Sequence, residues 1–178
     1  MKMKTGFTIL ELLLVVFLIS SLLLVGIPFW QNVDEQLLLN KEQQKVVLFL
    51  RQIQARAENL QEPLWLFTNR NLSEKRWCFS VQTKHDILCD CLKPHLCPKS
   101  VDAQFYYPHA NGKTMISTPK YFPERTTAFN GARNTVFSTC FVLQVADLKT
   151  FFSLYMVGSI RLKSFQSLSH CKKAIEGD

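Results

Sequence analysis

The feature that most constrains this chain is an apolar stretch close to its start. Residues 7–30 contain a single charged side chain, Glu11. As a helix rising about 1.5 Å per residue, the stretch would measure roughly 36 Å, enough to cross a bilayer. Lys2 and Lys4 precede it and no matching basic cluster directly follows, which predicts one membrane span with a cytoplasmic N-terminus. The stretch is too long for an ordinary secretory signal, and no A-x-A-like cleavage site follows it.

The remainder of the chain has the composition of a folded, basic domain. The chain has 178 residues, of which 47% are hydrophobic, and carries 21 Lys and Arg against 14 Asp and Glu, a net charge of +7. These values exclude a disordered chain, a collagen-like chain and a membrane protein with several spans. Beyond the N-terminal helix, a body of roughly 110–120 residues can bury a modest hydrophobic core.

Glu11 is the residue that a plain membrane anchor does not explain. An unpaired carboxylate in the apolar layer costs about 2.5–3.5 kcal/mol on insertion scales, and such residues are usually functional. The chain has no cationic side chain close to Glu11 that would offset this cost. Its partner is therefore expected to come from elsewhere.

The residues around Glu11 carry a family resemblance. The run Gly6-Phe7-Thr8-Ile9-Leu10-Glu11 resembles the cleavage motif of the type IV pilin and pseudopilin family. The resemblance implies that prepilin peptidase cuts between Gly6 and Phe7 and that Phe7 is then N-methylated. It also implies that the new amine of one subunit meets Glu11 of its neighbour, where the two charges neutralise each other and favour one axial register. A second reading is that Glu11 serves only in recognition by the peptidase.

The apolar stretch is expected to continue into an amphipathic helix. Gly26 and Pro28 predict a kink or local melting, because proline removes one helical hydrogen bond and clashes with the preceding turn. Residues 31–62 then show apolar side chains on one stripe at helical spacing. The members of that stripe are Leu39, Val46, Leu50, Ile53, Ala57 and Leu60, with Phe49 at its edge and Glu42 as an exception.

From Pro63 onward the sequence changes to short β-like runs. The expected strands are Leu64–Thr68, Arg76–Gln82, Gln104–Tyr107, Thr135–Val145, Phe151–Val157 and Ile160–Phe165. Residues 83–103 and 108–134 are expected to be mainly loops. The predicted fold class is α+β and pilin-like: a long N-terminal helix, membrane-spanning and then amphipathic, packed on a C-terminal antiparallel β-sheet. The expected segments are a cleaved leader 1–6, a transmembrane and assembly helix 7–30, a helical extension 31–62 and an extracytoplasmic head 63–178.

The C-terminal strand is a candidate DNA-binding element. The pattern from Phe129 to Arg161 resembles the H-type pseudopilin and FimT-like branch of minor pilins, which is linked to DNA capture, although Ser159 stands where that branch usually has Arg. Arg161 and Lys163 share one face of a strand and could contact a DNA backbone without reading its sequence. The alternative is a solvated edge strand whose charges prevent aggregation.

The chain has an even number of cysteines, which favours disulfides in an oxidising compartment. They are Cys78, Cys89, Cys91, Cys97, Cys140 and Cys171. We expect Cys140 to pair with Cys171 and the other four to join the region 78–97. Zinc at Cys89, Cys91 and Cys97, with His95 between them, is the alternative, but this spacing is not a standard zinc pattern.

No catalytic motif is present, and no metal or cofactor is expected. The chain has no Gly-rich phosphate loop, no H-E-x-x-H and no G-x-S-x-G. The predicted function is a non-enzymatic minor pilin or pseudopilin that joins or initiates a pilus, with DNA uptake or protein secretion as possible purposes. Its expected partners are prepilin peptidase, other pilins and DNA. Its expected location is the inner membrane, with the body in the periplasm. A membrane-anchored extracytoplasmic enzyme is the alternative from another class.

Overall fold

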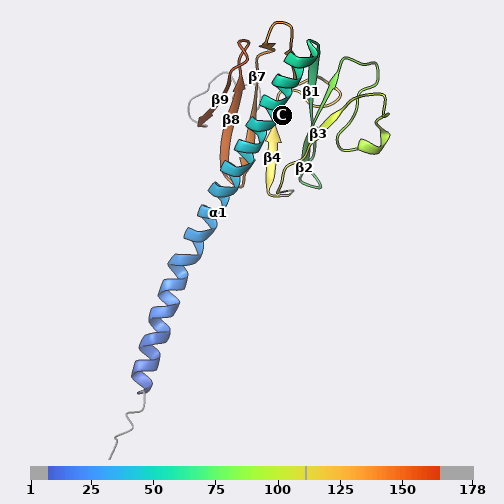
Figure 1. Cartoon of the computed structure of the whole chain (residues 1–178). Helices are drawn as coiled ribbons and strands as arrows, with labels where there is room; N and C mark the ends of the chain where they lie inside the picture. Colours follow the sequence, from blue (N-terminus) through green and yellow to red (C-terminus); the bar gives the residue numbers. More distant parts are fainter. Residues whose placement is uncertain (1–7, 111, 165–178) are drawn as a thin grey trace, which may run out of the picture. The chain divides into compact units, whose positions relative to one another are not determined.

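A computed structural model describes residues 8–110 and 112–164, and of residues 24–32 and 164 it describes the backbone alone (Figure 1). The chain divides into two compact units, Met1–Leu37 and Leu38–Asp178. Helix α1 (Ile9–Leu60) runs from the first unit into the second. The leader, Gly6 and Phe7 lie outside the described residues.

Thr8 forms the N-cap of α1. Its Oγ1 accepts a hydrogen bond from the backbone N–H of Glu11 over 3.3 Å. Thr8 and Glu11 therefore occupy the first and last positions of a T-x-x-E capping sequence. The negative charge of Glu11 in the first turn also stabilises the helix by interacting with the positive end of its dipole. The backbone stays helical through Gly26 and Pro28, so neither residue ends the helix, and the expected kink there remains a prediction.

The second unit contains the amphipathic part of α1. Of the expected stripe, Leu39, Val46, Leu50, Ile53 and Ala57 are buried, as is Phe49. Leu60 is 47% exposed, so its assignment to the stripe is wrong. The physical reason is that the helix ends at this residue, and Gln61 then turns the chain with a φ of 54°.

Nine described strands form two antiparallel sheets. Sheet A has the order β3-β2-β1-β5-β6, and sheet B has the order β4-β7-β8-β9. The strands of sheet A are β1 (Pro63–Asn71), β2 (Arg76–Thr83), β3 (Gln104–Tyr106), β5 (Thr127–Asn130) and β6 (Thr135–Val136). Those of sheet B are β4 (Thr114–Ser117), β7 (Thr139–Val145), β8 (Leu148–Leu154) and β9 (Ile160–Ser164).

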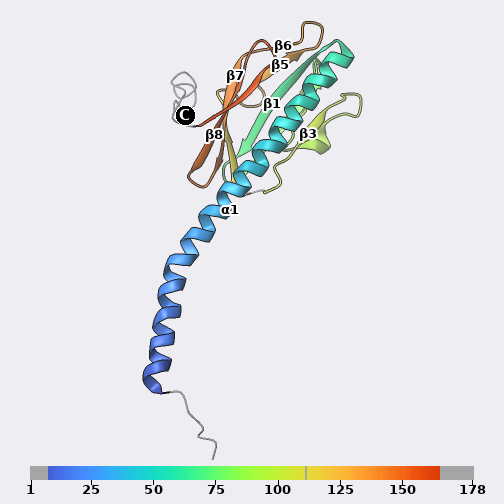
Figure 2. The same cartoon turned by 60° about the vertical axis from the view of Figure 1, so that its left-hand side comes forward.

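One hydrophobic core joins both sheets to the second half of α1. In Figures 1 and 2 this part of the helix crosses the body beside strands of both sheets. The Phe79 ring of β2 meets the Phe141 ring of β7 edge to face at 5.7 Å, and Phe141 stacks on Phe152 of β8 at 4.7 Å. Leu50 and Ile53 of α1 belong to the same buried cluster. The body therefore depends on α1 as the element that both sheets share.

The connection after β5 lies directly against the end of α1. A Cβ added to Gly131 would lie 1.8 Å from the Ala57 carbonyl oxygen and 2.4 Å from its carbon. Because both atoms belong to the helix backbone, no side-chain movement can make room. Gly131 is therefore required for close contact between this turn and the helix.

The outer face of sheet A is covered at strand β2 by the connection between β2 and β3. Within it, disulfides join Cys78 to Cys91 and Cys89 to Cys97. The buried Gln82 side chain donates to the Ile87 carbonyl at 2.9 Å and accepts from the Cys89 N–H at 2.8 Å. Strand β2 is therefore buried on both faces, by α1 on one side and by this disulfide-linked connection on the other.

Several expected strands have different boundaries. The expected strand Thr135–Val145 is divided into β6 and β7, which pair in different sheets. Strands β7 and β8 form a hairpin that turns at Ala146 and Asp147, since Ala146 takes a φ of 49° and Val145 pairs with Leu148. Strands β4 and β5 lie in 108–134, which was expected to be mainly loop.

The predicted fold class is wrong as stated, and so is the predicted inner-membrane location. Within the described residues, no helix is long and apolar enough to cross a membrane. The body also has two antiparallel sheets instead of the one expected, because β1 and β2 pair with β5 and β3, whereas β7 and β8 pair with β4 and β9.

Candidate functional site

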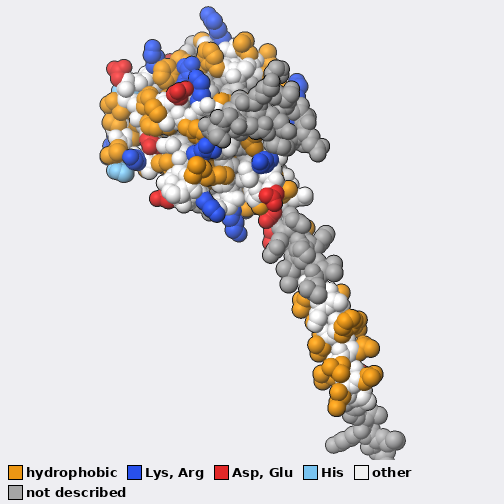
Figure 3. Space-filling model, turned by 180° about the vertical axis from the view of Figure 1, so that it is seen from behind, with side chains coloured by type: hydrophobic (Ala, Val, Ile, Leu, Met, Phe, Trp, Pro, Cys, Tyr) orange, Lys and Arg blue, Asp and Glu red, His pale blue; other side chains and the backbone are white. Residues whose placement is uncertain are grey.

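The first candidate surface is the described apolar part of α1, residues 9–23. Its side chains are exposed all around the helix, with Ile9 at 84%, Phe17 at 71% and Leu22 at 73% (Figure 3). Large exposed apolar surfaces on a protein usually mark an interaction site. The segment therefore has the chemistry of a surface that is covered by a partner.

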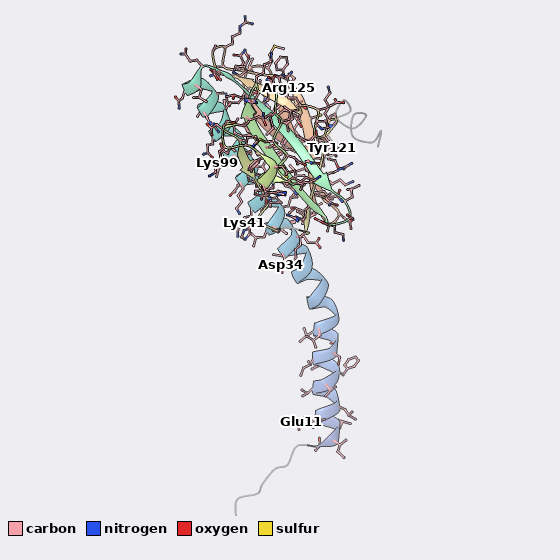
Figure 4. The ribbon with its side chains drawn as sticks, turned by 90° about the vertical axis from the view of Figure 1, so that its right-hand side faces the viewer. Glu11, Asp34, Lys41, Lys99, Tyr121 and Arg125 are labelled. Carbon is pink, nitrogen blue, oxygen red and sulfur yellow. A yellow bond between two sulfur atoms is a disulfide. The ribbon has the colours of Figure 1, made fainter. Side chains whose placement is uncertain are left out.

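The polar groups of this segment are few, and most are satisfied internally. The Ser20 hydroxyl donates to the Val16 carbonyl at 2.7 Å, and the Ser21 hydroxyl donates to the Leu18 carbonyl at 2.9 Å. Glu11, labelled in Figure 4, is the remaining polar side chain of residues 9–23. Within this segment, Glu11 alone would need an external partner if the surface were covered.

A second carboxylate, Glu42, is fully buried in the other half of α1. Its oxygens accept hydrogen bonds from the Tyr106 hydroxyl at 3.2 Å and from the backbone N–H of His109 at 2.9 Å. Burial, and then the nearby Glu42 charge, raise the pKa of Tyr106 well above its usual range. This site holds the segment after β3 against the helix and is structural. The sequence marked Glu42 only as an exception on the apolar stripe.

The structure places both predicted DNA-contact residues on β9. Arg161 is exposed and pairs across the sheet with Ser153, while Lys163 is half-buried and pairs with Phe151. The Arg161 guanidinium carbon lies 5.4 Å from the centre of the Tyr155 ring. Because Arg161 and Lys163 are two residues apart in one strand, they share a face, as expected. Whether they contact DNA stays a prediction.

The cysteines support the disulfide reading. Cys78, Cys89, Cys91 and Cys97 pair with one another, as expected, so the thiolates that zinc would need are already used. Cys140 is disulfide-bonded as well. Its expected partner, Cys171, lies outside the described residues. No group of three or more His, Cys, Asp or Glu side chains in the described part of the chain could hold a metal ion.

Sequence reasoning missed a contact between a cation and two aromatic rings. The guanidinium carbon of Arg125 lies 5.0 Å from the ring centre of Trp65 and 5.0 Å from that of Phe137. These three residues, here called the Arg125 cluster, come from β1, from the connection before β5 and from the junction between β6 and β7. No local pattern in the sequence brings them together.

The comparisons with known proteins give one informative match. An uncharacterized protein of Haemophilus influenzae is 46% identical over 169 residues, which cover 95% of this chain and 99% of that protein. No family model matches the chain, and no solved structure matches it. At this identity and coverage, the chain belongs to the same family as the uncharacterized Haemophilus influenzae protein.

Proposed function

We propose that this chain is a minor subunit of a type IV pilus or pseudopilus, made as a precursor that prepilin peptidase cuts between Gly6 and Phe7. The observation that carries the proposal is the exposed apolar surface of residues 9–23. The Ser20 and Ser21 hydroxyls of this surface bond to carbonyls of their own helix, which leaves the Glu11 carboxylate as its polar side chain available to a partner. Such a surface suits packing against the equivalent helices of other subunits. The role is structural, and no catalytic step is part of it.

A pairing of charges between subunits would account for a carboxylate within this apolar surface. When neighbouring helices cover residues 9–23, the Glu11 carboxylate loses its water and requires a cation. Cleavage after Gly6 would create an amine at Phe7, directly before Thr8 and four residues before Glu11. The Phe7 amine of one subunit and Glu11 of the next would then neutralise each other in a dry interface.

Two measurements test processing and assembly separately. Mass spectrometry of the mature protein should show a chain that begins at a methylated Phe7, whereas an intact Met1 in cells with active prepilin peptidase would contradict the family assignment. Glu11→Leu should leave the fold of the body unchanged and lower the amount of the subunit in purified fibres. Leu13→Ala is the matched control, because it trims the same surface without removing a charge. Wild-type incorporation of Glu11→Leu would refute the pairing.

A second candidate function is DNA capture by the assembled subunit. Arg161 is exposed on β9, and Lys163 lies on the same face two residues later. Two phosphate contacts of this kind would give weak binding that ignores sequence and falls steeply with salt. Arg161→Gln with Lys163→Gln should flatten the dependence of log K on log salt by about 1–2 units. A subunit that shows no gel shift at low salt would instead favour a pseudopilus that serves protein secretion.

A further inference from the structure

The Arg125 cluster has the chemistry of a binding site that neither filament assembly nor strand β9 uses. The guanidinium carbon of Arg125 lies over both the Trp65 and the Phe137 ring, 5.0 Å from the centre of each. Stacking uses the faces of the guanidinium and leaves its N–H groups at the edge, where they can donate to an oxyanion. The rings therefore fix the orientation of the cation before a ligand arrives.

Among the described residues, Arg125 forms no ion pair with an acidic side chain. The carboxylate of the adjacent Glu124 lies 3.4 Å from Lys120 Nζ and so has a cationic partner of its own. A guanidinium with no acidic partner within residues 8–110 and 112–164 favours an anionic ligand.

The position of the cluster leaves room for that ligand. Leu64 and Leu66 of β1 face the core with α1, so Trp65 between them faces the opposite side of sheet A. Figure 4 shows Arg125 and Tyr121, from the same connection, on the side of the body away from Lys41 of α1. The Phe137 side chain is 60% exposed, so one part of the ring can still accept a partner.

We propose that the Arg125 cluster binds single-stranded nucleic acid, with a phosphate on Arg125 and an unpaired base stacked on Phe137. Aromatic platforms beside cations are the usual means of holding single strands without regard to sequence. An acidic peptide would use Arg125 but would gain nothing from the exposed ring. A duplex would also gain little, because its bases are already stacked on one another. This inference does not rest on filament assembly, and it concerns a different surface from Arg161 and Lys163.

The test uses the full-length chain and a fluorescently labelled oligo(dT), with binding followed by anisotropy at low salt. Phe137→Ala should weaken binding about tenfold, which lies within the range that one base stacked on an aromatic ring contributes by alanine substitution. Arg125→Gln should weaken it and reduce the salt dependence by about one phosphate contact. The matched controls are Leu96→Ala, which trims another exposed apolar side chain, and Arg51→Gln, which removes another exposed cation.

Further arms separate this site from the alternatives. A duplex of equal length should bind more weakly than oligo(dT) to the wild type and should respond little to Phe137→Ala. Polyglutamate should not displace the oligonucleotide at equal charge concentration. The proposal is overturned if Phe137→Ala binds oligo(dT) as the wild type does, or if polyglutamate competes equally well. Loss of binding only in the Arg161→Gln, Lys163→Gln variant would also overturn it while supporting the β9 surface.

Discussion

The two parts of helix α1 with described side chains differ in what their apolar residues do. In residues 9–23 apolar side chains occupy every side of the helix, and all of them are exposed. In residues 38–60 they recur every three or four positions, and the stripe they form is buried against two sheets. The comparison teaches that apolar content alone does not identify a core. The periodicity does, because only a stripe leaves a polar side for water.

The two carboxylates sharpen the same comparison. Glu42 lies on the stripe and is fully buried, and two donors of the body satisfy it. Glu11 lies in the exposed apolar part, and its backbone N–H bonds to Thr8 while its carboxylate is open to solvent. The buried Glu42 is thus structural, whereas the exposed Glu11 is available to a partner.

The largest expected effect comes from a leucine in the buried stripe. Leu50 is fully buried, so Leu50→Ala should lower the free energy of unfolding by about 3–4 kcal/mol through lost burial and a cavity. Leu13→Ala, at a side chain 63% exposed, should change it by less than about 0.5 kcal/mol. Chemical denaturation followed by tryptophan fluorescence, to which the buried Trp77 contributes, measures both. Equal losses of unfolding free energy in the two variants would contradict the assignment of Leu50 to the core and of Leu13 to the exposed surface.

Gly131→Ala should destabilise the body by about 3 kcal/mol. The new Cβ would meet the Ala57 carbonyl group of α1, and backbone atoms on both sides must move to avoid it. Gly112→Ala is the matched control, because a Cβ there meets no atom within 4 Å and strains only a φ of +84°. That control should lose about 1 kcal/mol. The comparison fails if both alanine variants unfold at the same denaturant concentration.

Glu42→Ala should cost about 2 kcal/mol, because it leaves the Tyr106 hydroxyl and the His109 N–H without their acceptor. Glu42→Gln keeps an acceptor oxygen and should lose less. Glu11→Gln, the equivalent change in the exposed part, should leave the free energy of unfolding within about 0.5 kcal/mol of the wild type. Thermal unfolding of the three variants gives the order, and a loss in Glu11→Gln as large as in Glu42→Ala would contradict it.

The smallest effect is expected in the dependence of stability on alkaline pH. Because the pKa of Tyr106 is raised by burial and by Glu42, the unfolded chain releases this proton first. The contribution of Tyr106 is therefore fully present below pH about 10, the ordinary pKa of tyrosine, and is lost as the pH rises further. The stability gap between the wild type and Tyr106→Phe should narrow above pH 10. A gap that stays constant from pH 8 to pH 11 would contradict the raised pKa.

The sequence predicts those features of the structure that depend on residues close together in the chain, and it does not predict those that join distant residues. Local patterns predicted the buried stripe, the strands β1, β2 and β9, and disulfides within the region 78–97, although not which cysteines pair. The partners of Glu42 lie 64 and 67 residues away, so no local pattern could reveal them. The Arg125 cluster joins three separate segments for the same reason. Strands β4 and β5 have four residues each, too short for an alternating pattern to stand out.

The internal hydrogen bonds of Ser20 and Ser21 have a consequence for how accurately any assembly on this surface could be aligned. Because both hydroxyls are bonded to their own helix, the described surface from Ile9 to Leu23 is chemically almost uniform along its length. Packed helices could slide past one another by a turn, about 5.4 Å, with little change in apolar contact. On this described surface, Glu11 alone makes one axial register differ in energy from another, because only one register brings its charge to a cationic partner. A single charge would then set the axial spacing between subunits, while the apolar side chains supply most of the contact area.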